Sequence, residues 1–391
     1  MLAELSLFEL AVFSFAWACI GGLPGFYLFS AIDRNPRVGA RIGVVVGVAV
    51  GLGGVAIGLI DSAAALLNAV LVLWLIGFGA AAVAPLLGVQ PGRYAKSVSL
   101  SQRSADLAYG LLLPAFVLTS IIIVFPMIWN VLLAFRPVRL RDLQDFRLFS
   151  FDDLTFANFE RVFNTRGFFD TLGRTFVYTV SGTILAILFG LIAALIVKDK
   201  FPGRNLVRGF LLFPYIAPII SVVLIWKMMF NAQYGLVNEV VDALGGRRMD
   251  FLNTPGIAFT MVILFQAWRY FPFAFLFILA RIQAIPDELY EAAKVDGAAP
   301  SERLVYITLP ELRSVIGTLF LLRFIWTFNK FDDVFLLTGG AAQTKLVTIE
   351  VYDQLFGSRN VGTAAAVALV LAVVLFGLVA IYQRFFNVEE T

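Results

Sequence analysis

The sequence predicts an all-α membrane protein, a polytopic helical bundle with about nine transmembrane helices. Hydrophobic residues make up 60% of the 391 residues and charged residues only 15%, and the mean hydropathy is +0.87. A soluble domain is about 45–50% apolar and about 25% charged. The composition therefore indicates a chain that lies mostly within a bilayer.

The predicted helices are apolar runs of roughly 20 residues, which is long enough to cross about 30 Å of hydrocarbon. The chain before the first run contains Glu4 and Glu9 but no Lys or Arg. A secretory signal begins with a positive region, so we expect the first run to be a retained span. The nine runs are at about 9–30, 40–60, 64–88, 108–135, 172–197, 208–230, 256–280, 312–331 and 361–384.

The basic residues predict an orientation. The loops 31–41, 89–107, 198–208 and 281–313 each contain three or four Lys or Arg residues, whereas the tight loop 61–63 contains none. Short basic loops stay on the cytoplasmic side, which places the N-terminus outside and the C-terminus in the cytoplasm. The long segment 136–171 is then external. Its many Phe residues suit a cap that packs on the membrane surface, or a docking face for an external partner.

The composition also restricts the chemistry. The chain has one cysteine, Cys19, and no histidine. These two facts exclude a disulfide framework, a cysteine metal site and any nucleophile that is activated by histidine. We expect no catalytic residue, no metal site and no cofactor held by this chain.

A short polar island lies between the seventh and eighth predicted spans and would face the cytoplasm. Pro286 suits the first turn of a helix, and the acidic Asp287 and Glu288 suit its positive end. Gly297 is a natural helix stop. The pattern predicts a short helix that is too polar to insert, with Ala292 and Ala293 leaving a shallow surface that can sit in a groove. By itself this pattern is also compatible with a plain surface helix.

The spacing of the island resembles that of a known family. Glu291-Ala292-Ala293 is followed by Gly297, then by Ile307 and Leu309-Pro310, and this pattern resembles the EAA loop of permeases of ATP-binding-cassette (ABC) importers. The residues Leu279–Pro286 are similar to those of the carbohydrate branch, the maltose-type permeases, and so are the stretches 213–218, 234–238 and 337–340.

The resemblance implies a coupling helix, at about 287–297, that sits in a cleft of a cytoplasmic ATPase. The chain has no G-x-x-x-x-G-K-[ST] phosphate loop, so ATP and Mg would be bound by that partner. It also implies a permease domain at 108–391 with a six-helix core and the EAA loop at 286–310. Residues 1–107 would be about three additional helices and a cytoplasmic linker. The candidate coupling residues are Leu289, Tyr290, Glu291, Ala292, Ala293, Asp296 and Gly297.

Two polar clusters within or beside predicted spans are candidates for the substrate pathway, because polar side chains in a membrane are costly and often functional. In the first, Gln266, Arg269, Tyr270 and Phe273 fall three and four residues apart, which places them on one helix face. Pro272 can bend the span there. An aromatic belt with Arg269 reaching to lipid headgroups is the alternative interpretation.

The second cluster lies at the end of the eighth span. It contains Thr327, Asn329, Lys330 and Asp332. An ordinary polar helix end, with Lys330 paired with Asp333, is the alternative. Both stretches are similar to those that contact sugar in maltose-type permeases, although Arg269, Lys330 and Asp332 place charge where that permease has neutral or apolar residues.

The leading hypothesis is a permease subunit of an ATP-driven carbohydrate importer in a bacterial inner membrane. Its expected partners are a second permease, an ATPase dimer, an external sugar-binding protein, membrane lipids and the sugar, with no nucleic acid. A permease for another solute, such as the anionic glycerol phosphate, stays open because Arg269 and Lys330 suit an anion. The other classes considered are an ion-coupled secondary transporter, for which no half-repeat is evident, and a membrane-embedded enzyme or scaffold.

Overall fold

The computed structural model describes residues 118–143 and 154–385, and these are helical with no β-strand. The three predicted spans before residue 108 lie outside the described residues. The chain divides into two compact units, Met1–Trp129 with Arg141–Leu154, and Asn130–Leu140 with Thr155–Thr391. Of the first unit, the structure describes the π-helical turn η2 (Ser120–Val124), the first part of α6 (Phe125–Ala134) and most of the 3₁₀ turn η3 (Leu140–Leu143).

The second unit begins with the end of α6 and the short helix α7 (Ala157–Asn164). Asn158 is fully buried and its amide donates to the carbonyls of Ala134, at 3.0 Å, and Arg136, at 2.7 Å. Phe135 packs against Phe156 and Phe159. The described part of the segment 136–171 is therefore folded, whereas the prediction that it caps the membrane stays a prediction.

Four helices of the described chain are long and apolar enough to cross a membrane. They are α8 (Phe168–Val197), α12 (Ile257–Gln283), the continuous run Pro300–Phe328, and α18 (Val361–Phe385). The run Pro300–Phe328 consists of α14 (Pro300–Arg303), the π-helical turn η4 (Leu304–Thr308) and α15 (Leu309–Phe328). The predicted spans at 172–197, 256–280, 312–331 and 361–384 are thus confirmed as apolar helices.

The predicted span at 208–230 is apolar but sharply bent. The chain forms α9 (Arg204–Ile216) and α10 (Ile219–Met229), which meet at an angle of 94°. Pro218 cannot donate a backbone hydrogen bond and disfavours helical geometry in the residue before it. Ala217 accordingly has the extended ψ of 141°. Pro272, by contrast, lies inside α12, which continues through it.

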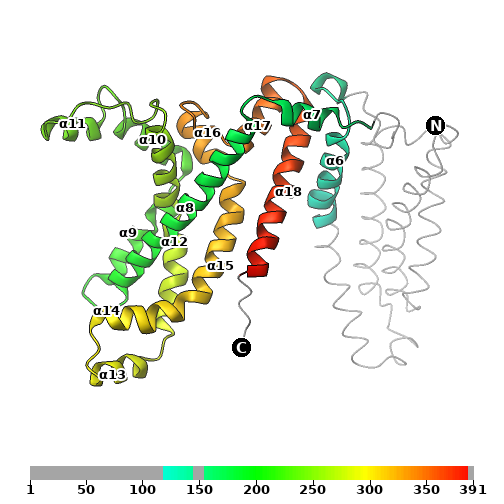
Figure 1. The fold of residues 1–391 in the computed structure, drawn as a ribbon. Helices are drawn as coiled ribbons and strands as arrows, with labels where there is room; N and C mark the ends of the chain where they lie inside the picture. Colours follow the sequence, from blue (N-terminus) through cyan, green and yellow to red (C-terminus); the bar gives the residue numbers. More distant parts are fainter. Residues whose placement is uncertain (1–117, 144–153, 386–391) are drawn as a thin grey trace, which may run out of the picture. The chain divides into compact units, whose positions relative to one another are not determined.

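The core of this unit is the contact between α8 and α12 (Figure 1). Gly190 makes their close approach possible, because a Cβ atom there would lie 2.7 Å from the backbone nitrogen of Phe275 and 2.8 Å from the Cβ of Ala274. Phe275 and Ile278 are fully buried in the same cluster. Small residues at such crossings let membrane helices pack tightly.

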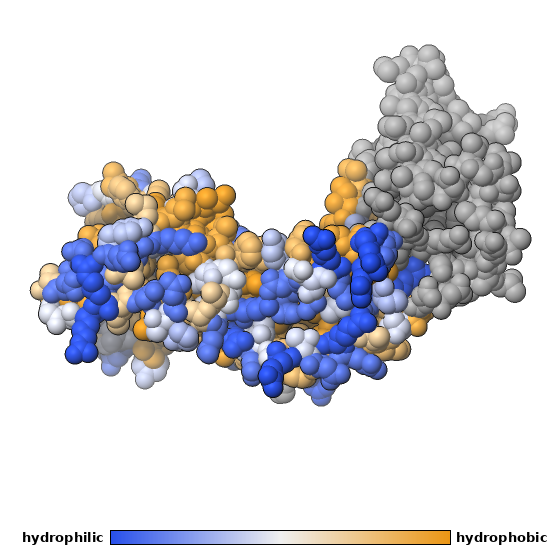
Figure 2. Space-filling model, turned by 90° about the horizontal axis from the view of Figure 1, so that it is seen from above, coloured by the Kyte–Doolittle hydropathy of each residue, from blue (hydrophilic) through white to orange (hydrophobic). Residues whose placement is uncertain are grey.

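Short helices lie at the two ends of the bundle. One end has α13 (Asp287–Val295), and the opposite end has α11 (Leu236–Ala243), α16 (Asp332–Thr338) and α17 (Val347–Tyr352), which continues into the π-helical turn η5 (Asp353–Gly357) (Figure 1). Seen from this second end, hydrophilic side chains gather over much of the described surface and hydrophobic side chains flank them (Figure 2). This distribution suits a bundle whose sides face lipid or another helical subunit.

Candidate functional sites

The predicted short helix of the polar island is present as α13. It begins after Pro286 and has Asp287 and Glu288 in its first turn and Lys294 in its last. Gly297 has φ +79°, a conformation that costs other residues energy and commonly ends helices. The backbone N–H of Ala298 then donates to the carbonyl of Ala293 at 2.9 Å. The local sequence therefore fixes both the length of α13 and its sharp exit.

The candidate coupling residues lie on the surface, since no residue of α13 is buried. Leu289 is 45% exposed, and Glu291, Ala292, Asp296 and Gly297 are exposed as well. Ala293 and Tyr290 are half-buried. This arrangement leaves a small-residue surface free to contact another protein.

Two side-chain contacts hold α13 and its neighbours to the bundle. The hydroxyl of Tyr290 lies 3.0 Å from that of Thr308, which is buried in η4. Arg281, near the end of α12, forms an ion pair of 2.5 Å with Glu311 at the start of α15. The Arg281 side chain also donates to the Glu311 carbonyl. The loop is thus tied to both long helices that it connects.

The second site is a buried polar cluster around Tyr270 of α12. The Tyr270 hydroxyl donates to Oδ1 of Asp333 at 3.2 Å. The Arg323 guanidinium lies 4.4 Å from the centre of the Tyr270 ring, and the Lys330 ammonium lies 4.9 Å from it. Cations over an aromatic face are attracted to it, more strongly when water is excluded. We call Gln266, Arg269, Tyr270, Arg323, Thr327, Lys330 and Asp333 the Tyr270 cluster.

Thr327 joins the two helices that form most of this cluster. Gln266 of α12 donates to the Thr327 hydroxyl of α15 at 3.0 Å, and Arg323 donates to the same hydroxyl at 3.3 Å. All three side chains are buried. The sequence prediction had placed Gln266 and Thr327 in separate polar stretches, and the structure brings them into contact.

Arg269 closes the break between α9 and α10. Its two terminal nitrogens donate to the carbonyls of Pro214 at 2.9 Å and Ala217 at 3.1 Å. Only 8% of the residue is exposed. The alternative in which Arg269 reaches lipid headgroups therefore does not hold. Arg269 instead satisfies carbonyls that the broken helix leaves without helical partners.

Lys330 of the cluster forms an ion pair with Asp332, another predicted pathway residue. Lys330 pairs with Asp332 at 2.9 Å, whereas Asp333 bonds Tyr270, so the alternative interpretation, a Lys330–Asp333 pair along one helix, does not hold. The reason is that α15 ends at Phe328 and α16 begins at Asp332, which leaves Lys330 in the linker between them.

Phe273 and Asn329 are not members of the cluster. Phe273 packs in a neighbouring aromatic group with Trp326, at 5.3 Å between ring centres, and Tyr215, at 6.3 Å. Asn329 is exposed and donates to the carbonyl of Ile325 in its own helix. Among the described residues, Asn329 therefore makes no hydrogen bond or ion pair with Tyr270 or its partners, and Asp332 is joined to the cluster by its ion pair with Lys330.

Sequence reasoning missed three residues of this region. Arg323 is a charged residue in the middle of a predicted span, a signal that should have singled it out. The sequence indicates Asp333 only as an alternative partner for Lys330 and not as a partner for Tyr270. Tyr178 of α8 is fully buried and its hydroxyl has no hydrogen-bond partner among the described residues, and an aromatic residue in an apolar helix gives no sequence signal. Within the same part of the chain, no three Asp, Glu, Cys or His residues gather as metal ligands would.

Known proteins are similar to this chain in sequence and in fold. Residues 186–387 match the family described as "Binding-protein-dependent transport system inner membrane component". The inner membrane ABC transporter permease protein YcjO of Escherichia coli (strain K12) is 32% identical over 290 residues, which cover 73% of this chain and 96% of YcjO. The trehalose/maltose transport system permease protein MalF of Thermococcus litoralis is 31% identical over 283 residues, which cover 72% and 94% of the two chains.

A solved structure supports the fold. One chain in the crystal structure of a bacterial alginate ABC transporter, in complex with alginate pentasaccharide-bound periplasmic protein, superposes with a TM-score of 0.64. The identity is 22%, and the match covers 74% of this chain and 97% of that one. The resemblance to permease subunits of ABC importers is thus confirmed, and these relatives are transport components rather than enzymes. This chain belongs to the family of inner membrane components of binding-protein-dependent transport systems.

Proposed function

We propose that this chain is the permease subunit of an ATP-driven carbohydrate importer. It forms the translocation pathway together with a second permease, and an external sugar-binding protein delivers the solute. Two cytoplasmic ATPases, which bind ATP and Mg, drive it through α13. Residues 108–391 would be the permease domain, and residues 1–107 an additional N-terminal segment.

The observation that supports this proposal best is the connection between α13 and the Tyr270 cluster. The helices on either side of α13 are α12 and the run that ends in α15, and these same two helices hold Gln266 and Thr327 in contact. Tyr270 lies about 20 Å along α12 from the end near α13, at about 1.5 Å per residue. A displacement of α13 therefore moves helices that line the buried site.

The chemistry of the cluster suits a saccharide. Sugars present apolar C–H faces to aromatic rings and hydroxyl edges to polar side chains. Tyr270 and the neighbouring Phe273 provide rings, and Gln266 and Thr327 provide hydrogen-bonding groups. Rigid-body movement of helices is a common way to open such a site to alternate sides.

The test uses the complex purified from its native membrane through a tag on this chain. We expect saccharide and binding protein together to stimulate ATP hydrolysis, and Glu291→Ala to abolish most of that stimulation while the complex stays assembled. Gly297→Ala should act similarly, because a side chain at φ +79° costs about 1–3 kcal/mol. Glu160→Ala, at an exposed position of α7, is the matched control. Transport by the chain alone, or an unaffected Glu291→Ala variant, would overturn the proposal.

A second candidate function is a permease for an anionic solute, and Arg323 favours it. Arg323 is 3% exposed. It donates one hydrogen bond to the Thr327 hydroxyl, and its guanidinium lies over the face of the Tyr270 ring. Its Nε has no hydrogen-bond partner among the described residues. A buried cation without a carboxylate in an ion pair is costly, and an acidic group on the solute would offset that cost.

A further inference from the structure

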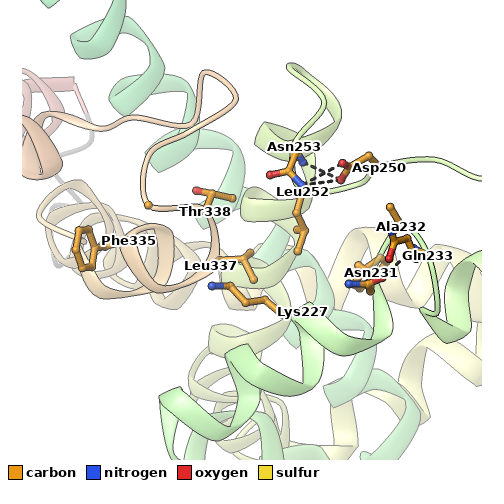
Figure 3. A pocket seen from close by; sticks show the side chains of 12 residues that line it. Lys227, Asn231, Ala232, Gln233, Asp250, Leu252, Asn253, Phe335, Leu337 and Thr338 are labelled. Atoms are coloured by element: carbon orange, nitrogen blue, oxygen red, sulfur yellow. Dashed lines mark hydrogen bonds between the residues drawn. The ribbon is translucent and has the colours of Figure 1, made fainter.

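A pocket of about 710 Å³ is lined by residues of α10 and α16 and of the segment before α12 (Figure 3). The helix α16 lies at the end of the bundle opposite α13 (Figure 1). The walls of the pocket are the end of α10 with the turn after it, the segment before α12, and the end of α16. Small-molecule sites usually have volumes of about 300–1,000 Å³. No residue of the pocket belongs to the Tyr270 cluster.

One wall of the pocket contains polar side chains that their own loops hold in place. Asp250 accepts hydrogen bonds from the Asn253 side chain at 2.9 and 3.0 Å and from its backbone N–H at 3.2 Å. Oδ1 of Asn231 accepts from the backbone N–H groups of Gln233 and Tyr234. These planar polar groups are therefore oriented before any ligand arrives.

The remaining groups complete a mixed surface. Phe335 lies on the side of the pocket opposite Asn231 and Asp250, and Lys227 extends between them beneath Leu337 (Figure 3). Within residues 118–143 and 154–385, neither Lys227 Nζ nor Asn231 Nδ2 has a hydrogen-bond or ion-pair partner. Apolar side chains beside amide, carboxylate and ammonium groups fit a ligand with one apolar face and hydroxyl edges.

The floor of the pocket separates it from the Tyr270 cluster. Leu337 is 2% exposed and belongs to an apolar core with Val223, Phe265 and Val334. The helix α16 nevertheless connects the two sites, since Asp333 at its start bonds Tyr270 and Thr338 at its end lines the pocket. The two residues are about 8 Å apart along the helix axis at about 1.5 Å per residue.

We propose that this pocket is a second saccharide site, which receives the solute before the solute reaches the Tyr270 cluster. The proposal rests on the proposed function, because it takes the solute to be a saccharide. The apolar side chains that line the pocket contact a C–H face, while Asn231, Asp250 and Lys227 bind hydroxyl groups. Movement of α16 and of the Leu337 floor then opens the way to the buried site.

Site-specific labelling tests the proposal in the full complex in lipid nanodiscs. In a Cys19→Ser background, Gln233→Cys introduces a thiol in the pocket at an exposed residue whose own contacts are made by its backbone. Ser358→Cys introduces a control thiol at an exposed position outside the pocket. The measurement is the rate of reaction with a polar maleimide in the presence of maltotriose, trehalose or an alginate trisaccharide. We expect a transported saccharide to slow labelling of the Gln233→Cys variant at least tenfold and to leave the Ser358→Cys variant unchanged.

Two results would overturn the proposal. One is a transported saccharide that leaves labelling of the Gln233→Cys variant unchanged. The other is protection by the saccharide-free binding protein alone, which would make the pocket a protein-docking surface. If no saccharide is transported at all, the proposed function fails instead, so the two failures are distinguishable.

Transport kinetics provide an independent measurement. Lys227→Met removes one exposed ammonium that has no hydrogen-bond or ion-pair partner among the described residues, so the fold should tolerate it. We expect a threefold to tenfold rise in the saccharide concentration for half-maximal transport, with the maximal rate unchanged. Lys200→Met, in the exposed loop before α9, is the matched control. An unchanged half-saturation for the Lys227→Met variant would contradict a role in saccharide binding.

Discussion

The hydroxyl of Tyr290 lies 3.0 Å from that of Thr308, although the two residues are 18 positions apart. This contact joins the surface helix α13 to the π-helical turn that continues into α15. Thr308 is 1% exposed, so the joint lies within the packed part of the loop. A surface helix that is attached to its bundle only through the chain at its two ends can tilt independently of the bundle. A side-chain hydrogen bond such as this one makes the helix and the bundle move together.

Tyr290→Phe removes this hydrogen bond and keeps the ring. We expect a decrease of about threefold to tenfold in saccharide-stimulated ATP hydrolysis, because a net loss of about 0.5–1.5 kcal/mol loosens the joint. The measurement compares stimulated hydrolysis with assembly of the purified complex. Tyr306→Phe is the control, since Tyr306 is 77% exposed. Equal stimulation of ATP hydrolysis in the two variants would show that the Tyr290–Thr308 hydrogen bond does not contribute to coupling.

Gly190→Ala tests the crossing of α8 and α12. An added Cβ atom would lie within 2.8 Å of Phe275 and Ala274, so the helices must separate, at a cost of about 1–3 kcal/mol. We expect a lower apparent melting temperature in detergent. Gly173→Ala, in the same helix, is the control because a Cβ atom there meets nothing within 4 Å. A Gly190→Ala variant as stable as the control would mean that the helices cross less tightly than the structure indicates.

The long helices could be predicted from the sequence because a run of about twenty apolar residues is typical of a membrane-spanning helix. The break between α9 and α10 could not be predicted, because hydropathy is continuous across it. Prolines do not identify it either. Pro214 and Pro272 lie inside helices, whereas Pro218 sits at the bend.

The same limit applies to the buried site. Helical spacing placed Gln266, Arg269 and Tyr270 on one face, and all three do belong to the cluster. Spacing gives no information about partners far along the chain, such as Asp333 for Tyr270 at a separation of 63 residues. Arg323 could have been singled out by its charge, whereas its position over the Tyr270 ring follows only from the packing of α12 and α15.

Arg323→Met separates the two candidate solute classes. For a neutral saccharide, we expect the concentration for half-maximal transport to change by less than about threefold, because among the described residues Arg323 makes one hydrogen bond, to Thr327, and contacts the Tyr270 ring. For an acidic solute, the substitution removes the buried cation that pairs with the acidic group. We then expect the solute concentration for half-maximal transport to rise about tenfold to a hundredfold, which corresponds to about 1.4–2.8 kcal/mol.

Arg323→Lys is the matched control, since it keeps the positive charge and should restore most of the affinity for an acidic solute. Transport of paired neutral and acidic saccharides by the three proteins provides the measurement. An equal loss for both classes would contradict a charge-specific role for Arg323.

Lys345 forms ion pairs with Glu350 of α17, at 2.7 Å, and with Asp353, at 2.6 Å. Burial raises the pKa of Glu350, but hydrogen bonds from Lys345 and Gln354 outweigh it and lower that pKa below its ordinary value. Burial lowers the pKa of Lys345, and the two carboxylates outweigh it and raise that pKa above its ordinary value.

A carboxyl whose pKa is lowered by folding stabilises the fold above its unfolded pKa, and that stability is lost as the pH falls through the folded pKa. An ammonium whose pKa is raised stabilises the fold below its unfolded pKa, and loses that effect as the pH rises through the folded pKa. The ordinary values are 4.5 for Glu350 and 10.5 for Lys345. The contribution of the ion pairs is therefore greatest between these two values.

Lys345→Met should lower the stability at neutral pH by about 1–2 kcal/mol, because it leaves the nearly buried Glu350 without its cation. In thermal unfolding this amounts to a decrease of about 2–6 °C. We expect the difference from the native chain to shrink as the pH falls below the ordinary pKa of Glu350, since a protonated carboxyl no longer needs a cation. Lys200→Met, which removes an exposed lysine, controls for the loss of one charge. A difference that stays constant from neutral pH into acid would mean that Lys345 stabilises the protein through packing and not through its ion pairs.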